Sequence, residues 1–362
     1  MRLDLTQIIR PNILSLRPYE SARSIANGGR IFLDANEAPD DPMSVARFNR
    51  YPEPQPAALR QQLAAYYQVH ASQIYMGRGS DEAIDLLVRM TCTPNKDAIL
   101  SCPPTYGMYA VAAEMQGARN VEVTMLLESN RFAIDLDRVT SALTDPSIKI
   151  FFLCRPNNPT GEITTLREVA TLAELCGPGR LLVVDEAYIE FSGEPNAISL
   201  LDQYPNIVVL RTFSKAWALA GVRFGVAISS LEIAEILERI RAPYPVPTPV
   251  RDLVAAHLIT DRIQSLQKTM SSIRSERERL TTQISKLRSV KLIYPSATNF
   301  LLVKIPGHAR SVFNHLMTSG IVVRNRSNQP LLGDCLRITV GSPQDNNELL
   351  NSWRDWERGT YA

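Results

Sequence analysis

Three short apolar runs in the middle of the chain each lead directly into polar residues that can carry chemistry. The runs are Ile148–Cys154, Leu181–Val184 and Ile207–Leu210. They are partly β-branched and apolar on both faces, which is typical of the central strands of a mixed or parallel sheet. Ligands of open α/β sheets bind in the crevice beyond the carboxyl ends of the strands. We therefore expect the polar residues after these runs to meet at one site: Asn158, Asp185, Tyr188 and Lys215.

Helical segments alternate with these runs. Two further apolar runs, Ala98–Ser101 and Gly225–Ile228, extend the set of expected strands. Ser80 is expected to cap a helix that begins with two acidic residues, and Thr165–Cys176 has helical spacing of its apolar residues. Alternation of this kind predicts an α/β fold with a large, mostly parallel sheet.

The pattern changes after Gly225. The segment Ala242–Val250 holds four prolines in nine residues, which must interrupt regular structure. A long charged helical stretch follows, over residues 249–287, and we interpret it as a connector. The expected strands Phe300–Val303 and Leu336–Val340 then suggest a smaller α+β domain with a final helix. We expect an N-terminal arm at residues 1–29, a large domain at 30–245 and a small domain at 246–362.

Length and composition exclude several classes of protein. A chain of 362 residues suggests two domains that share a cleft. Its net charge of +2 does not indicate a basic surface for binding nucleic acid. No apolar run is long enough to span a bilayer, and the N-terminus lacks the apolar region of a secretory signal. The five scattered cysteines favour buried thiols in the cytoplasm, and the four histidines make a metal site unexpected.

Several motifs resemble those of known enzymes. Asn157–Gly161, Asp185–Tyr188 and Ser214–Arg223 resemble the motifs of fold-type I aminotransferases that use pyridoxal 5'-phosphate (PLP). More narrowly, six segments are similar to the histidinol-phosphate aminotransferase family: Arg50–Pro56, Pro103–Tyr109, Asp185–Phe191, Ser214–Arg223, Ala242–Pro245 and Leu336–Gly341. The resemblance extends from about Leu16 to near the C-terminus.

The resemblance implies a role for each residue around the cofactor ring. Lys215 would hold the PLP aldehyde covalently, and its freed amine would later move a proton. Asp185 would face the pyridine nitrogen and keep it protonated. Tyr188 and Asn158 would hydrogen-bond the phenolic oxygen, and Tyr106 would stack on the ring.

The resemblance also implies a binding site for the cofactor phosphate. Gly77–Asp81 leads into the helix near Ser80, and the free N–H groups of a helix start suit a dianion. Read alone, this glycine pair fits an ordinary helix-entry turn equally well. Asp81 belongs to the same segment, and Ser214 and Arg223 would complete the site. Tyr51 would reach the cofactor of a neighbouring subunit, which implies a homodimer.

Substrate contacts depend more on the resemblance than on pattern. Arg337 corresponds to the family's anion-binding arginine, although the strand pattern alone fits a surface arginine equally well. Arg324 resembles a second such arginine, Tyr19 resembles a lid residue, and Asn158 is expected to contact substrate as well. Two residues keep no assigned role. Asn36 only matches a family motif, and Arg155 stands where a smaller residue is expected, as a surface arginine or at the pocket edge.

The function implied is transamination in histidine biosynthesis. The substrates would be histidinol phosphate with 2-oxoglutarate, and imidazole acetol phosphate with glutamate. Two alternatives share the fold: an aromatic amino acid aminotransferase and a decarboxylase of a phosphorylated amino acid. A more remote alternative is a non-catalytic regulator that senses PLP. About 30 residues precede the expected fold, too few for a helix-turn-helix domain of such a regulator.

Overall fold

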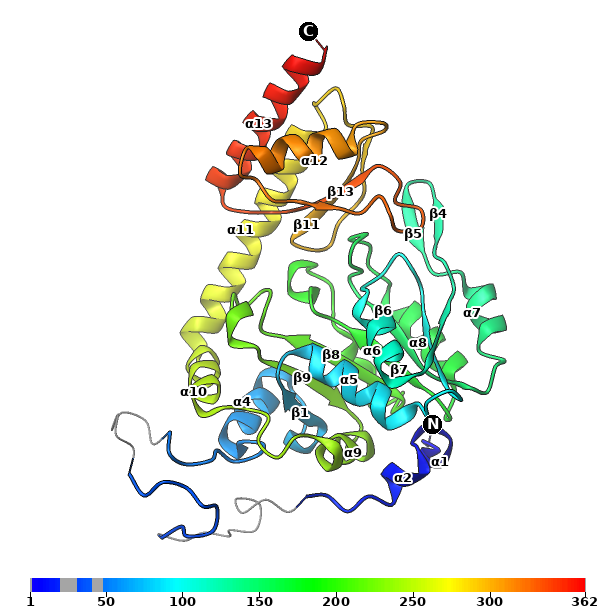
Figure 1. The fold of residues 1–362 in the computed structure, drawn as a ribbon, viewed down its shortest axis with the longest axis vertical. Helices are drawn as coiled ribbons and strands as arrows, with labels where there is room; N and C mark the ends of the chain where they lie inside the picture. Colours follow the sequence, from blue (N-terminus) through cyan, green and yellow to red (C-terminus); the bar gives the residue numbers. More distant parts are fainter. Residues whose placement is uncertain (1, 20–30, 41–47, 362) are drawn as a thin grey trace.

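The computed structural model describes residues 2–19, 31–40 and 48–361. These residues form a large domain around a seven-stranded sheet, with a smaller domain at one end (Figure 1). The rest of the expected N-terminal arm, with residue 30, lies outside the described residues. In the described part of the chain, no helix is long and apolar enough to cross a membrane.

The large sheet has the strand order β1-β9-β8-β7-β6-β2-β3. The strands β3, β2, β6, β7 and β8 pair in parallel, and β9 pairs antiparallel with both β8 and β1. The expected mostly parallel sheet is therefore confirmed. The strand bounds are β1 Ile74–Gly77, β2 Ala98–Ser101, β3 Arg119–Glu122, β6 Ile148–Cys154, β7 Leu181–Asp185, β8 Ile207–Thr212 and β9 Gly225–Ser229.

Helices cover both faces of this sheet, which explains why its central strands are apolar on both sides. Alternate residues of one strand enter different cores: Phe151 belongs to the core that includes residues of α4, α8 and α10, whereas Phe152 belongs to the core that includes residues of α5, α6 and α9. The helix bounds are α4 Ala57–Tyr67, α5 Ser80–Thr91, α6 Met108–Gln116, α7 Leu136–Ala142, α8 Leu166–Cys176, α9 Leu231–Ile240 and α10 Thr248–His257. Short 3-10 helices are η1 Ala71–Gln73, η2 Ile189–Phe191, η3 Ala197–Leu200 and η4 Ala220–Val222.

The first residues of the chain pack on the large domain. Helices α1 (Leu5–Ile8) and α2 (Pro11–Leu14), with Ile9 between them, bury Ile8, Ile9 and Ile13 in the core beside α5 and α9. The backbone N–H of Arg10 donates to the carbonyl of Met90 at 3.0 Å. The arm therefore begins with a segment that is anchored by burial and by hydrogen bonds.

The helical stretch expected over residues 249–287 is helical over most of its length, but it consists of two helices with a break between them. Helix α10 ends at His257 and α11 runs over Thr260–Ile284. Between them, Leu258 is buried with the large-domain core, whereas Ile259 is extended and exposed. Packing of α10 against α4, with burial of Leu258, is thus favoured over continuing α10 directly into α11. Figure 1 shows α11 leaving the large domain and crossing to the small one.

The small domain has a four-stranded sheet in the order β10-β11-β13-β12. Its core joins α11 to α12 and α13, with Trp353 fully buried. Its bounds are β10 Leu292–Ile293, β11 Phe300–Lys304, α12 Ala309–Thr318, β12 Arg324–Asn325, β13 Cys335–Thr339 and α13 Pro343–Tyr361. The hairpin β4 (Leu126–Glu128) and β5 (Arg131–Ala133) reaches this domain, where the ring of Phe132 lies 5.0 Å from that of Tyr294.

Candidate active site

A cavity of about 140 Å³ lies beyond the carboxyl ends of β6, β7 and β8. This is the place that the sequence predicts for convergence of the strand-end residues. Nine of the expected cofactor residues line it: Ser80, Asp81, Tyr106, Asn158, Asp185, Tyr188, Ser214, Lys215 and Arg223. Segments up to 143 positions apart therefore share one pocket because parallel strands end at the same edge. The separation of 143 positions is that between Ser80 and Arg223.

Asp185 ends β7 as a buried carboxylate with two hydrogen-bond donors. The hydroxyl of Tyr109 donates to Oδ2 at 2.8 Å, and the backbone N–H of Ala187 donates to Oδ1 at 3.1 Å. Burial raises the pKa of the Asp185 carboxyl to about 6, although both hydrogen bonds oppose this. Sequence reasoning assigned Tyr109 no role. Its only signal was its place in the segment Pro103–Tyr109.

Lys215 follows β8 and presents its amine to the cavity. Its Nζ lies 5.6 Å from the centre of the Tyr188 ring. Partial burial and the positive charge of Arg337 lower the pKa of the Lys215 ammonium, while Asp81 and Asp185 oppose this. A lowered pKa makes the neutral, nucleophilic amine more accessible, as covalent chemistry at a lysine requires.

The start of α5 lies so close to Arg223 and to the first residue of β9 that glycine is required at positions 79 and 225. Together they form a small pocket. Gly79 has a φ of +79°, and a Cβ there would lie 2.9 Å from Nη2 of Arg223. A Cβ at Gly225 would lie 2.5 Å from the backbone nitrogen of Ser80. The prediction of Ser80 as the cap is corrected here: Gly79 is the N-cap, Ser80 is the first helical residue, and no described side chain caps the helix. The first N–H groups of α5 are therefore not used by a capping side chain.

Arg223 is held in place beside this helix start. Its Nη1 donates to Oγ of Ser214 at 3.1 Å, and its Nη2 donates to Oδ2 of Asp81 at 3.2 Å. The hydroxyl of Tyr106 donates to the other oxygen of Asp81 at 3.1 Å. Asp81 thus contacts protein donors on both oxygens, so its role here is to orient Arg223 and Tyr106. Serine, arginine and a helix start together are the donor set that a phosphate requires.

A chain of hydrogen bonds joins the small domain to the cavity. Nη1 of Arg337 donates to Oδ1 of Asn158 at 2.5 Å, and Nδ2 of Asn158 donates to the Tyr188 hydroxyl at 3.4 Å. The guanidinium of Arg337 also lies 5.2 Å from the centre of the Phe300 ring. Arg324 lies directly opposite Arg337 in the β12–β13 pair and is exposed. Arg337 therefore reaches the cavity lining through Asn158, and Arg324 lies beside Arg337 on the same sheet edge, although neither arginine lines the cavity itself.

The sequence matches the aminotransferase class I and II family over residues 35–352. The chain belongs to this family. A histidinol-phosphate aminotransferase from Xylella fastidiosa is 43% identical over 350 residues, which cover 96% of each chain. This aminotransferase therefore aligns with that relative over almost its whole length.

Solved structures share the fold of this aminotransferase. The histidinol-phosphate aminotransferase from Clostridium acetobutylicum matches with a TM-score of 0.78 at 23% identity, covering 86% of this chain and 91% of that one. The enzyme from Sinorhizobium meliloti, solved in complex with pyridoxal-5'-phosphate, matches with a TM-score of 0.75 at 26% identity. That match covers 86% of this chain and 83% of the other. The expected α/β fold is therefore shared with these two structures.

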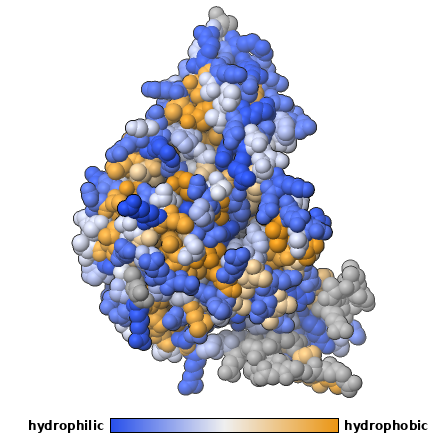
Figure 2. Space-filling model, turned by 180° about the vertical axis from the view of Figure 1, so that it is seen from behind, coloured by the Kyte–Doolittle hydropathy of each residue, from blue (hydrophilic) through white to orange (hydrophobic). Residues whose placement is uncertain are grey.

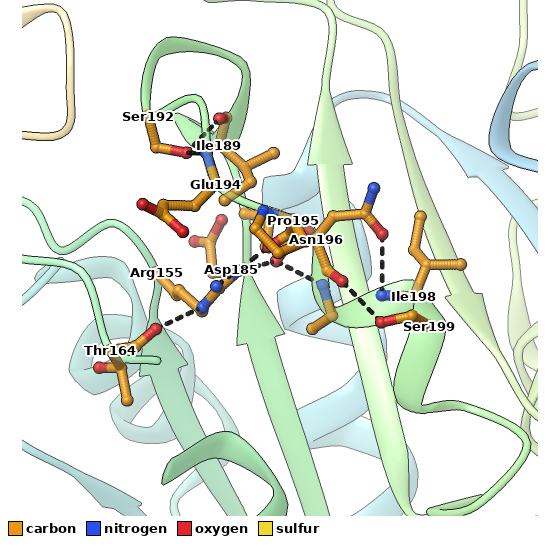
Figure 3. Close-up of polar contacts among 12 residues, drawn as sticks. Arg155, Thr164, Asp185, Ile189, Ser192, Glu194, Pro195, Asn196, Ile198 and Ser199 are labelled. Carbon is orange, nitrogen blue, oxygen red and sulfur yellow. Dashed lines mark hydrogen bonds and ion pairs between the residues drawn. The ribbon is translucent and has the colours of Figure 1, made fainter. Parts of the chain in front are cut away.

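Arg155 is neither on the surface nor at the pocket edge of this aminotransferase. It is 1% exposed, and its Nη1 donates to Oε1 of Glu186 at 2.7 Å. Its Nε and Nη2 donate to the carbonyls of Thr164 and Pro195 at 2.7 and 3.0 Å (Figure 3). Its backbone N–H donates to the carbonyl of Asp185 at 2.8 Å. Arg155 therefore ties the end of β6 to the end of β7.

Glu186 also connects this ion pair to β8. Nη1 of Arg211 lies 3.6 Å from Oε2 of Glu186, and Nη2 of Arg211 lies 2.6 Å from Oε1 of Glu190. All four side chains are at most 10% exposed. A buried network of this kind is expected to fix the spacing of the three strands that carry Asn158, Asp185 and Lys215.

Besides Arg155, Arg324 and Arg337, three further residues singled out by sequence do not line the cavity. Tyr51 stacks on Tyr244 with ring centres 4.5 Å apart, and it lines a separate groove together with Asn36. Tyr19 is 71% exposed. None of the three lines the cavity of its own chain.

Proposed function

We propose that this aminotransferase exchanges an amino group between histidinol phosphate and 2-oxoglutarate, with PLP as its cofactor. The reverse pair is imidazole acetol phosphate and glutamate, as in histidine biosynthesis. The observation that carries the proposal is the cavity that combines an amine, a buried carboxylate and a phosphate-type donor set. The similarity to relatives named histidinol-phosphate aminotransferase, over 96% of the chain, supports the choice of substrate.

The residues present fit PLP at both of its ends. The glycine-permitted pocket of Gly79, Ser80, Ser214 and Arg223 would hold the phosphate. Asp185 would hold the pyridine nitrogen, Asn158 and Tyr188 the phenolic oxygen, and Tyr106 one face of the ring. When bound, PLP supplies an electron-accepting ring that stabilises negative charge on a substrate carbon.

The protein's own contribution is charge placement and proton movement. The Asp185 carboxylate is buried, so its charged form is costly without a cationic partner. Burial therefore favours a cationic group beside it. Lys215 offers an amine whose lowered pKa allows it to accept and return a proton at Nζ. Arg337 and Arg324 are proposed to bind the anionic end of the substrate, Tyr19 to help close over it, and Asn158 to lie between the two ligands.

Covalent labelling tests the cofactor assignment. Borohydride reduction of the loaded enzyme followed by peptide mapping is expected to find the cofactor on Lys215. Lys215→Ala should still fold and should lose this label. Label on another lysine in the parent enzyme would overturn the assignment.

A screen of amino donors tests the substrate. The conversion of the cofactor to its amino form is followed by absorbance with histidinol phosphate, phenylalanine, tyrosine and O-phosphothreonine. We expect histidinol phosphate to give the highest kcat/KM. A better rate with phenylalanine would favour the aromatic aminotransferase, and release of carbon dioxide from O-phosphothreonine would favour the decarboxylase. Absence of turnover with every donor would favour the regulator.

A homodimer with shared active sites is part of the proposal. Large apolar side chains are exposed in the single chain: Phe48, which lines the same groove as Tyr51, is 55% exposed, and Leu33 is 93% exposed. Seen from behind, hydrophobic areas are broad on the large domain and the tip of the small domain is mainly hydrophilic (Figure 2). Exposed apolar area of this kind marks contact surfaces. Twofold dimers are also the commonest closed assembly.

Subunit mixing tests whether Tyr51 acts in a neighbouring site. A heterodimer of Tyr51→Ala and Lys215→Ala subunits contains one site with neither substitution only if Tyr51 acts across the interface. Activity should then appear from two impaired parents. No recovery in heterodimers of verified composition would contradict the shared site.

We also propose a cytoplasmic location. All five cysteines are buried free thiols, which suits a reducing compartment. Fractionation of cells expressing the tagged chain should recover it with cytoplasmic markers, and recovery with secreted proteins would contradict this.

A further inference from the structure

Three arginines share one face at the edge of the small-domain sheet. In the antiparallel pair of β12 and β13, Arg324 lies directly opposite Arg337. Arg326 follows two residues later, and its backbone N–H continues the ladder by donating to the carbonyl of Cys335 at 2.9 Å. Because side chains alternate along a strand, Arg326 lies on the same face as Arg324 and Arg337. The neighbour Leu336 lies on the other face, in the small-domain core.

This face is the one that meets the cavity. Arg337 reaches Asn158 of the cavity lining at 2.5 Å. Arg326 lies within electrostatic range of both Arg337 and Tyr188, and Tyr188 also lines the cavity. Sequence reasoning singled out Arg324 and Arg337 here and passed over Arg326.

No residue in the described part of the chain pairs with the charge of Arg326. Among the described residues its guanidinium makes no hydrogen bond or ion pair, and its Nε is buried. Burial and the positive charge of Arg324 lower the pKa of Arg326, and burial and the charge of Arg326 lower the pKa of Arg337. Buried donors are normally paired, and three neighbouring cations repel one another. An anion placed between them would relieve both costs.

We propose that Arg326 is a third anion-binding residue of the substrate site, and that it makes the site favour a phosphate over a carboxylate. This inference rests on the proposed function. A carboxylate has one charge and two oxygens, which the fork of one arginine can satisfy. A phosphate monoester has close to two charges and three terminal oxygens, so it can bind additional guanidinium groups. Arg326 therefore acts mainly on the phosphorylated substrate.

The test compares donors with and without a phosphate on the Arg326→Gln holoenzyme. We expect kcat/KM for histidinol phosphate to fall by about ten- to a hundredfold, mainly through KM, which corresponds to one charge-assisted hydrogen bond. The value for histidinol should stay unchanged, and the value for glutamate should fall by less than that for histidinol phosphate. Arg326→Lys keeps the positive charge but lacks the planar guanidinium, which can donate two parallel hydrogen bonds. It should therefore lower kcat/KM for histidinol phosphate by less than Arg326→Gln does.

Arg310→Gln is the matched control, because Arg310 is an exposed arginine of α12 in the same domain. It makes the same change in net charge and should leave all three donors unaffected. An equal loss for histidinol phosphate and histidinol, or an equal loss in Arg310→Gln, would overturn the role of Arg326.

Inhibition by inorganic phosphate separates this inference from the proposed function. Phosphate is tested as a competitive inhibitor against glutamate, so the result does not depend on which donor the parent enzyme prefers. Its inhibition constant should be about tenfold weaker in Arg326→Gln than in the parent or in Arg310→Gln. An unchanged constant overturns the inference even where histidinol phosphate is the preferred donor. A weakened constant supports it even where another donor is preferred.

Discussion

The two sides of the cavity differ in how their charges are paired. On the large-domain side, Asp185 has two protein donors and Arg223 is paired with Asp81 and Ser214. On the small-domain side, Arg324, Arg326 and Arg337 have no carboxylate partner among the described residues. The first side is preorganised by the protein itself, whereas the second keeps its positive charge available.

This difference matches the residence time of the proposed ligands. A cofactor that stays bound gains from side chains already fixed in position, because little ordering remains to be done on binding. A substrate anion must bind and leave in every cycle. A guanidinium already held by a carboxylate would have to give up that ion pair each time. Unpaired arginines avoid this cost, at the expense of mutual repulsion in the empty site.

The largest expected effect concerns the paired side. Asp185→Asn should keep the fold and lower turnover by about 10²- to 10⁴-fold, because a neutral amide cannot stabilise a cationic ring nitrogen and such buried pairs contribute several kcal/mol. The measurement is single-turnover kinetics on enzyme whose cofactor content is equal to that of the parent. Near-normal turnover at full cofactor content would mean that the paired side does not depend on this charge.

The buried ion pair of Arg155 and Glu186, on the large-domain side, should have the largest effect on the free energy of unfolding. Arg155→Met leaves Glu186 charged and buried, and should lower the free energy of unfolding by about 3–5 kcal/mol. Urea unfolding measures this. The double variant Arg155→Met with Glu186→Gln should recover much of the loss, because the buried carboxylate that lost its nearer partner is then neutral and Arg211 is still paired with Glu190.

An exposed ion pair provides the matched control for this experiment. Arg89→Met removes one partner of the Arg89–Asp85 pair on the surface of α5 and should cost at most about 0.5 kcal/mol. Equal losses in Arg155→Met and Arg89→Met would show that burial of the network adds nothing.

The raised pKa of Asp185 predicts a pH dependence of the cofactor-free protein. The carboxyl titrates near 6 when folded and near 3.8 when unfolded, so the folded state holds more protons between these values. Its stabilising contribution is present below about pH 4 and is lost as the pH rises to about 6, by up to about 3 kcal/mol. Asp185→Asn should therefore be more stable than the parent above pH 6 and similar to it below pH 4. A stability difference that is the same at both pH values would contradict the burial of this charge.

Apart from the surface control, the smallest expected effect lies on the unpaired side. Arg337→Ala should lower kcat/KM by about ten- to a hundredfold with both histidinol phosphate and glutamate, since it removes one charge-assisted contact of about 1.5–3 kcal/mol. Cofactor content and thermal stability should change little, unlike in the variants of the paired side. A loss of bound cofactor equal to the loss of activity would remove the distinction between the two sides.

The sequence by itself predicted the framework and most of the proposed site. Apolar runs that alternate between two cores can only be central strands, and the polar residues after β6, β7 and β8 must meet because parallel strands end at one edge. Lys215, Asp185 and Arg223 were accessible in this way, since each lies within a local motif. Local patterns decide local structure.

Only the tertiary structure decided how charges far apart in the chain are paired. The bond between Tyr109 and Asp185 joins residues 76 positions apart, and Arg155 finds Glu186 at a distance of 31 positions. The break after α10 depends on burial of Leu258, and the place of Arg326 depends on the pairing of β12 with β13. Burial and desolvation depend on everything that packs around a group, and no window of sequence contains that information.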